Sequence, residues 1–224
     1  MTRTRIDPHV KILDEQVVSR AKARGVEVLV YAPHFTRYPT IRERAETFSD
    51  EDLLIVPGRE IFTGTWQDRK HVLALDLEAP IPDFITLEGA MAELERQDAT
   101  VLAPHPEFLS VGLERSDLDR YEDQIDALEV YNPKHLPRHN DRAAALAGEF
   151  DMGVFGSSYA HRRPSIGEVW TAVEADIETE SDLLGTLSGD LAKRVKHQPG
   201  RTHNLRRVAE FAHLGWENTW KKFD

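Results

Sequence analysis

The sequence contains no cysteine. This absence excludes disulfide bonds, thiolate metal sites and cysteine nucleophiles together. Any metal ion must therefore be held by histidine, aspartate or glutamate side chains. No apolar run approaches the roughly 18 residues of a membrane-spanning helix, and residues 1–10 lack the apolar core of a secretory signal. We therefore expect a cytoplasmic protein without a membrane partner.

Lysine is scarce, with 8 residues against 20 arginines, and these 28 basic residues are outnumbered by 39 aspartates and glutamates. The formal net charge of −11 repels phosphate at long range, so it disfavours binding to duplex nucleic acid. An acidic surface with few lysines also fits a halophilic-like protein that works in high salt, where charges are screened. The alternative is an ordinary acidic cytosolic enzyme.

Three common catalytic or binding motifs are missing. The glycines form neither a phosphate-binding loop nor a dinucleotide fingerprint. The G-x-S-x-G elbow of serine hydrolases is also absent. The sequence therefore disfavours nucleotide-driven motors, hydride transfer and serine hydrolysis.

Strand-like apolar runs alternate with helix-like segments through most of the chain. The expected helices span 14–25, 40–52, 86–98, 116–124 and 136–150. A β-α-β-α order predicts parallel strands with right-handed crossovers. Seven or eight such strands suffice to close a barrel, so the predicted fold class is an α/β, TIM-like barrel.

The chain is expected to be one domain, residues 1–224, because barrels of this length are often single domains. Residues 176–224 are interpreted as a C-terminal helical extension packed on the barrel. It contains an acidic helix, a basic stretch at 192–207 and an aromatic terminal helix at 208–223. The basic stretch is more often a solvated loop than a phosphate or RNA contact.

Five histidines and one glutamate lie at the edges of the strand-like runs: His9, His34, Glu60, His71, His105 and His161. Side chains at the carboxyl ends of neighbouring parallel strands converge on one mouth of a barrel. Imidazole and carboxylate groups gathered there predict a metal site. His71 is the exception, because it opens its run. A single histidine at a strand end is usually structural, whereas six matching positions together indicate a site. The other five histidines are interpreted as surface or packing residues.

The order of short motifs in residues 4–173 supports the same interpretation. The motifs are Asp7–Lys11, Pro33–His34, Pro57–Glu60, His71, His105–Pro106, Glu129–Asn132 and Ser158–His161. In this order the chain resembles the PHP (polymerase and histidinol phosphatase) superfamily. Members of that superfamily are metal-dependent phosphoesterases, and the resemblance implies a distorted (β/α)7 barrel.

The chain departs from the family pattern at several ligand positions. The second histidine of the opening Asp-x-His-x-His motif is Lys11, and the aspartate of the closing motif is Tyr159. An Asp-His pair is replaced by Pro33 and His34. The early ligand expected after His9 falls at residue 16 or 17, which are Gln and Val.

These departures affect the three metal positions that the resemblance implies in different ways. The position built from Glu60, His71 and His105 is intact. The position that uses His9 and Glu60 lacks two partners, and the position that uses His34 and His161 lacks one. The resemblance therefore implies one or two divalent ions, with manganese, zinc or iron as candidates.

The implied activity is metal-assisted hydrolysis of a small phosphorylated metabolite or a nucleotide. His34 and His161 are candidates for a second metal position or for acid–base chemistry. Lys11, Arg37 and Arg69 are candidates for phosphate binding.

Three alternatives stay open. One is a degenerate, non-catalytic PHP-like domain that binds a ligand or a partner, which the altered Lys11, Pro33 and Tyr159 favour. Another is an RNA-associated PHP-like barrel, because a related barrel occurs as an RNase P protein subunit. The last is a metal-dependent amide hydrolase, since histidine-rich barrels also carry that chemistry.

Overall fold

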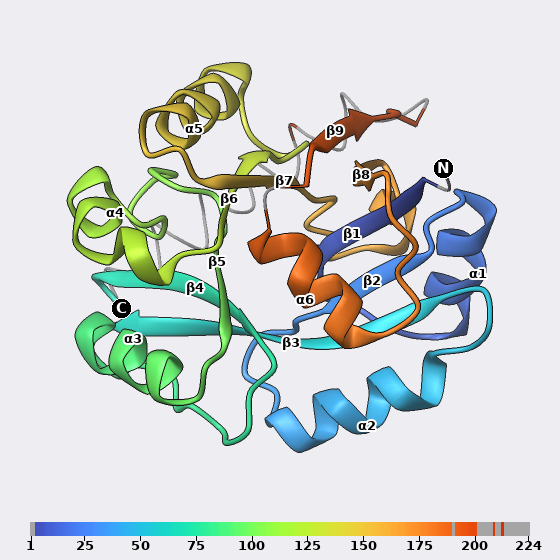
Figure 1. Ribbon diagram of the computed structural model, residues 1–224, viewed down its shortest axis with the longest axis horizontal. Helices are drawn as coiled ribbons and strands as arrows, with labels where there is room; N and C mark the ends of the chain where they lie inside the picture. Colours follow the sequence, from blue (N-terminus) through green and yellow to red (C-terminus); the bar gives the residue numbers. More distant parts are fainter. Residues whose placement is uncertain (1–2, 190, 201–207, 209–211, 213–224) are drawn as a thin grey trace.

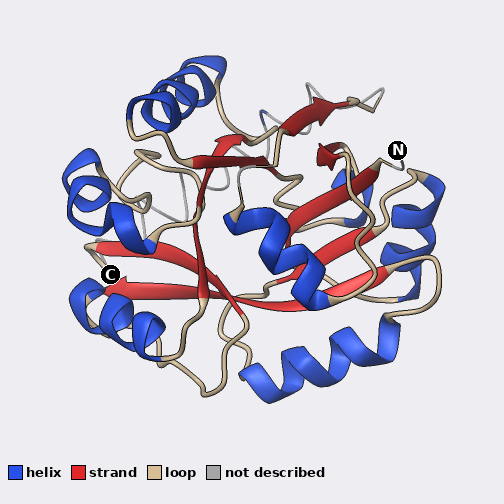
Figure 2. Ribbon diagram, viewed as in Figure 1, coloured by secondary structure: helices blue, strands red, loops and turns tan. Residues whose placement is uncertain are grey.

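The computed structural model describes residues 3–189, 191–200, 208 and 212. Within them, nine strands form one sheet that curls into a nearly closed barrel, and most of the helices cover its outer face (Figures 1 and 2). The strands are β1 Thr4–Val10, β2 Val28–Tyr31, β3 Leu54–Gly64, β4 Arg69–Leu75, β5 Thr100–Ala103, β6 Ala127–Tyr131, β7 Gly153–Gly156, β8 Val169–Val173 and β9 Lys193–His197. The helices are α1 Glu15–Ala23, α2 Tyr38–Phe48, α3 Leu87–Arg96, α4 Arg115–Tyr121, α5 Pro137–Glu149 and α6 Glu180–Ser188.

The strand order is β7-β6-β5-β4-β3-β2-β1-β8-β9, and β7 comes back against β8 and β9. A side chain bridges this seam. The hydroxyl of Thr171 on β8 accepts a hydrogen bond from the Gly156 N–H (2.9 Å) and donates one to the Gly156 carbonyl oxygen (3.0 Å). The predicted α/β, TIM-like barrel is confirmed.

Replacing Thr171 by valine is expected to lower the free energy of unfolding by about 2 kcal/mol. The change keeps the shape but leaves the buried N–H and carbonyl of Gly156 without their partner. Urea unfolding measures the loss. Thr47→Val is the matched control, because the Thr47 hydroxyl is exposed and bonds only within its own helix. An equal effect of the two changes would contradict the seam's role.

The prediction that all strands run parallel is wrong. β4 is antiparallel to both β3 and β5, and β8 is antiparallel to both β1 and β9. A tight turn at Gly64 reverses the chain between β3 and β4 without a helix. Gly64 has φ +79°, and a Cβ there would lie 2.3 Å from the Asp68 carbonyl oxygen. β4 therefore begins at the mouth where β3 ends, which brings His71 to the same mouth as the other histidines.

Two apolar layers hold the barrel together. The inner layer fills the barrel with side chains such as Ile6, Val30 and Phe155, and Leu183 and Leu187 of α6 join it. α6 lies across the strands in front of the barrel in Figure 1. The outer layer packs the sheet against α1 to α5. The barrel interior is therefore a packed core that leaves chemistry to its rim.

Side-chain caps fix the starts of two helices. Asp14 caps α1 by accepting from the N–H groups of Gln16 and Val17, and Thr86 caps α3 by accepting from the Gly89 N–H. These bonds satisfy donors that a helix cannot pair internally. No helix in the described part of the chain is long and apolar enough to cross a membrane.

The C-terminal region differs in part from expectation. Residues 193–197 of the basic stretch form β9, an edge strand paired with β8, and not a loop. The acidic helix is present as α6. The expected aromatic helix at 208–223 lies outside the described residues except for positions 208 and 212. Of these, Val208 is 67% exposed.

Candidate metal centre

Glu60 is the centre of the histidine cluster. It lies on β3, whose first half pairs with β2 and whose second half pairs with β4. One carboxylate oxygen, Oε1, is 3.4 Å from His9 Nε2, 3.5 Å from His71 Nδ1 and 3.4 Å from His105 Nε2. The other, Oε2, is 2.5 Å from His34 Nε2. Glu60 is fully buried, so the barrel mouth surrounds one carboxylate with four imidazoles.

His161 reaches this cluster through the loop after β7. Ala160 pairs with Val10 in an isolated bridge, and its carbonyl accepts from the Lys11 N–H at 2.9 Å. The His161 ring then lies 5.4 Å from the His34 ring, centroid to centroid. All six residues singled out at strand edges therefore gather at one mouth.

A buried carboxylate sets the backbone of His105. Glu129 Oε2 accepts from the His105 N–H at 2.8 Å, and its Oε1 accepts from the Ser157 hydroxyl at 2.5 Å. His105 has φ +37°, a conformation that non-glycine residues rarely adopt. Burial raises the pKa of Glu129 above its usual value. Glu129 thus joins the ends of β5, β6 and β7 around the histidine.

Three atoms of the cluster form a nearly equilateral triangle. Glu60 Oε1 is 3.4 Å from His105 Nε2 and 3.5 Å from His71 Nδ1, and the two nitrogens are 3.4 Å apart. Ligands about 2.1 Å from a tetrahedral ion lie about 3.4 Å from one another. The residues present therefore fit a divalent metal ion. Among the residues that the structure describes, Glu60, His71 and His105 form the group whose ligand atoms all lie within 4.8 Å of one another.

His9 adds a further observation in favour of a ligand. The residue is fully buried, and neither of its ring nitrogens makes a hydrogen bond to the described part of the protein. Buried polar atoms nearly always have a hydrogen-bond partner, so two buried ring nitrogens without one need an explanation. An imidazole facing a carboxylate across 3.4 Å is suited to share a cation with it.

The protonation states favour cation binding. Burial lowers the pKa of His71 to about 3 and holds those of His9 and His161 well below their ordinary value, with Lys11 and Lys134 adding to the effect for His9 and His161. Burial alone would raise the pKa of Glu60, but the charge of Lys11 and the nearby imidazoles hold it well below its usual range. Neutral imidazoles and an ionised carboxylate are the forms that bind metals.

Lys11 stands where the family motif has a histidine. Its ammonium is buried and donates to Glu60 Oε2 at 2.7 Å and to the Ala32 carbonyl at 2.6 Å. Burial lowers the pKa of Lys11 to about 8, and Glu60 opposes that shift. The Lys11 ammonium therefore lies against Oε2 of Glu60, the carboxylate oxygen that is not part of the triangle.

Tyr159, at the place of the family's aspartate, is buried with φ +45°. Its ring lies 5.6 Å from the Lys11 ammonium and 4.6 Å from that of Lys134. Lys134 Nζ is also 2.8 Å from His161 Nδ1. Sequence reasoning did not single out Lys134. Its signal is its position two residues after the Glu129–Asn132 motif.

His135 was interpreted with the other histidines as a surface or packing residue. The structure makes it a packing residue, because its ring is buried and stacks on Phe108 at 3.8 Å. Its ring also lies 6.2 Å from that of His105, at the edge of the cluster.

The two arginines proposed for phosphate binding lie at the rim. Arg69 is buried; it donates to the Trp66 carbonyl at 2.7 Å and lies over the Trp66 ring at 4.7 Å. It therefore holds the β3–β4 turn. Arg37 is exposed at the start of α2, beside a cavity of about 420 Å³.

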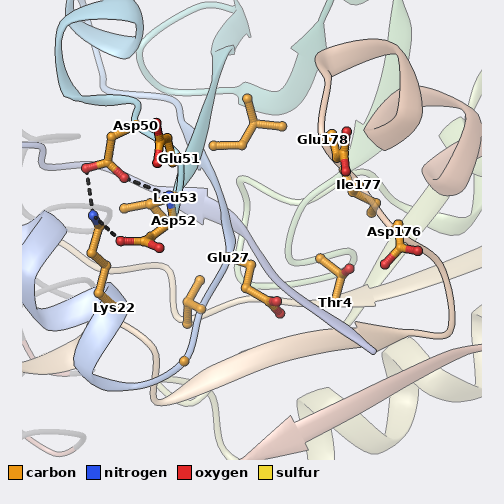
Figure 3. Close-up of a pocket in the computed structure, with 13 residues that line it drawn as sticks. Thr4, Lys22, Glu27, Asp50, Glu51, Asp52, Leu53, Asp176, Ile177 and Glu178 are labelled. Atoms are coloured by element: carbon orange, nitrogen blue, oxygen red, sulfur yellow. Dashed lines mark hydrogen bonds and ion pairs between the residues drawn. The ribbon is translucent and has the colours of Figure 1, made fainter. Parts of the chain in front are cut away.

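A cavity of about 810 Å³ lies at the opposite end of β1 to β3. Figure 3 shows its lining, in which Lys22 bonds to Asp50 and Asp52 and further acidic side chains surround the hollow. None of the residues singled out for metal or phosphate binding lines it. In barrels of this type the chemistry gathers at the other mouth.

Comparison with known proteins agrees with this fold. The family model described as PHP-associated matches residues 137–189. No curated protein matches the chain. PsfC from Pseudomonas syringae has a similar structure, with a TM-score of 0.70 and 22% identity over 96% of this chain and 98% of that one.

Two further solved structures share the fold. One is a two-domain protein from Bacteroides vulgatus containing a predicted PHP-like metal-dependent phosphoesterase, with a TM-score of 0.66 and 18% identity over 93% of this chain and 70% of that one. The other is the lesion-specific endonuclease PfuEndoQ from Pyrococcus furiosus, with a TM-score of 0.61 and 14% identity over 87% of this chain and 58% of that one. The chain is thus similar to the PHP-associated family model over residues 137–189, and it shares its barrel fold with these solved structures.

Proposed function

We propose that the chain is a metal-dependent phosphoesterase that hydrolyses a small phosphorylated metabolite or nucleotide. The observation that carries the proposal is the triangle of Glu60 Oε1, His71 Nδ1 and His105 Nε2, with edges of 3.4 to 3.5 Å. These three residues would hold the ion. One manganese, zinc or iron ion fits this ligand set, and His34, His161 and His9 are the candidates for a second.

A bound ion supplies hydroxide from water and withdraws charge from a phosphoryl oxygen. The protein's own groups would transfer protons and attract the phosphate. His34 is the candidate acid–base group, because its side chain is 27% exposed, whereas those of His9 and His105 are almost fully buried. The ammonium groups of Lys11 and Lys134 would attract the phosphate dianion to the mouth. Glu60 keeps Lys11 charged and in place.

Hydrolysis of phosphomonoesters by the metal-loaded protein tests this proposal. We expect turnover with manganese, zinc or iron, a loss of at least a hundredfold after chelation, and recovery when metal is added back. A phosphodiester and an amide substrate run in parallel separate the reaction classes. Turnover of the amide alone would replace the phosphoesterase with an amide hydrolase. Metal binding without turnover of any of the three would favour a PHP-like domain kept for binding.

One observation favours that second candidate, the non-catalytic domain. The buried ammonium of Lys11 already neutralises Glu60, so the carboxylate has a partner without any metal. A site that has lost its ion needs such a partner, because a buried unpaired charge is strongly destabilising.

A further inference from the structure

Three aromatic side chains gather at the rim of the mouth. Phe35 follows β2, Trp66 forms the turn between β3 and β4, and Phe84 precedes α3. The Phe35 ring lies 6.4 Å from Trp66 and 6.2 Å from Phe84, and Trp66 lies 5.8 Å from Phe84, centroid to centroid. We call these three residues the aromatic shelf.

The shelf is costly to maintain. Phe35 is 55% exposed and Phe84 is 43% exposed. Their φ angles are +50° and +63°, in the left-handed region that large side chains rarely enter. Exposed apolar rings and unfavourable backbone conformations both work against stability, and here they coincide at two residues. Leu109 shares both features outside the shelf, so they indicate a binding site only together with contacts to the metal centre.

The shelf is continuous with the metal centre. Phe35 directly follows His34, and its ring lies 4.9 Å from that of Phe62. Phe62 in turn stacks on His71 at 4.0 Å with 4° between the planes. Two ring-to-ring steps therefore separate the shelf from an imidazole of the triangle. A ligand with its phosphate at Glu60, His71 and His105 would extend over the shelf.

The charge of the metal centre and the apolar surface of the shelf together indicate the kind of ligand that could bind at both. The metal centre and the ammonium groups of Lys11 and Lys134 favour an anionic group at the mouth. The shelf offers aromatic faces, with the Arg69 guanidinium 4.7 Å from the Trp66 ring. A sugar phosphate would leave these faces in water. A phosphoester that also carries a flat aromatic ring would cover them.

We propose that the aromatic shelf binds the base of a nucleoside monophosphate whose phosphate lies at the metal centre. The proposal rests on the proposed phosphoesterase function and names its substrate class. Stacking is tolerant of base identity, because every base has a π-face. A single nucleotide is favoured over a nucleic acid strand because the net charge of −11 repels a polyanion.

The kinetic test compares adenosine 5′-monophosphate with ribose 5-phosphate, which has the same phosphoester and sugar but no base. We expect the metal-loaded full chain to prefer the nucleotide in kcat/KM by roughly tenfold or more. Phe35→Ala and Phe84→Ala should each reduce this preference, by raising KM for the nucleotide more than KM for ribose 5-phosphate. Leu109→Ala is the matched control, because Leu109 is 49% exposed with φ +51° in a loop outside the shelf.

A binding measurement tests whether the shelf binds the base, independently of whether the protein hydrolyses the phosphoester. Adenosine 5′-monophosphate should quench part of the tryptophan fluorescence, and Trp66→Phe should remove that part while the other three tryptophans remain. Ribose 5-phosphate should not quench it. Quenching without turnover would support the shelf and overturn the phosphoesterase. Equal kcat/KM for the two substrates, or unchanged values in Phe35→Ala and Phe84→Ala, would overturn the shelf. Tighter shelf-dependent binding of an oligonucleotide than of the mononucleotide would overturn the choice of a single nucleotide.

Discussion

Replacing His71 and His105 together by alanine is expected to abolish metal binding. The change removes two of the three corners of the ligand triangle and leaves the Glu60–Lys11 ion pair in place. Glu60 is a poorer target for this purpose, because its loss would also leave the Lys11 ammonium buried without a carboxylate. With its metal at a hundredfold excess over Kd, the wild-type protein should gain about 2.7 kcal/mol in free energy of unfolding. The melting temperature should then rise by roughly 5–10 °C.

Elemental analysis and thermal unfolding with and without added metal measure this effect. The variant should take up no manganese, zinc or iron and show no rise in melting temperature. His139→Ala/His197→Ala is the matched control, since it also removes two imidazoles but from α5 and β9, away from Glu60. A control that loses metal as well, or a His71/His105 variant that keeps it, would refute the triangle as the binding site.

Lys11→Met is expected to destabilise the metal-free protein by about 3–5 kcal/mol. The substitution leaves Glu60 as a buried carboxylate without its ammonium partner, 2.7 Å away in the wild-type chain. Added metal should restore much of this loss, because the ion then compensates the charge that Lys11 balanced. The metal-induced stabilisation should therefore be larger in Lys11→Met than in the wild-type protein.

A double-mutant cycle isolates the ion pair. Glu60→Gln alone should also destabilise the protein, and Lys11→Met/Glu60→Gln should be far less destabilised than the two single changes added together. Chemical unfolding in the presence of a chelator gives the four free energies. Additive effects would show that Lys11 and Glu60 do not depend on each other, and the assignment of Lys11 as a built-in counter-charge would be wrong.

Much of the fold followed from local sequence patterns. Alternating strand-like and helix-like runs predicted a TIM-like barrel, and the helices expected within 14–25 and 86–98 are present as α1 and α3. These features depend on contacts within a few residues, so they are legible along the chain. The direction of the strands could not be predicted in the same way. The reversal at Gly64 and the pairing of residues 193–197 with β8 depend on which strands lie side by side, and local sequence patterns do not give this information.

For the histidines, too, part of the site was predictable from the sequence and part required the structure. Their positions at strand edges predicted that His9, His34, Glu60, His105 and His161 would meet, because a barrel brings strand ends together. His71 did not fit a parallel barrel, and only the antiparallel course of β4 explains its place opposite Phe62. The interpretation of Lys11 as a replaced ligand was available from the motif. A pairing of Lys11 with Glu60 or with a substrate phosphate was also open from the sequence, whereas its burial and the choice of Glu60 required the structure.

The sequence by itself determined the residue types available for chemistry: no cysteine, histidines at strand edges, and lysine and tyrosine where ligands were expected. The tertiary structure decided which of them form a ligand triangle and which aromatic rings line its approach. Phe35, Trp66 and Phe84 are separated along the chain by strands and turns, and nothing in their spacing predicts contact. Distances of a few ångströms between such residues depend on strand register and loop conformation, which long-range packing sets.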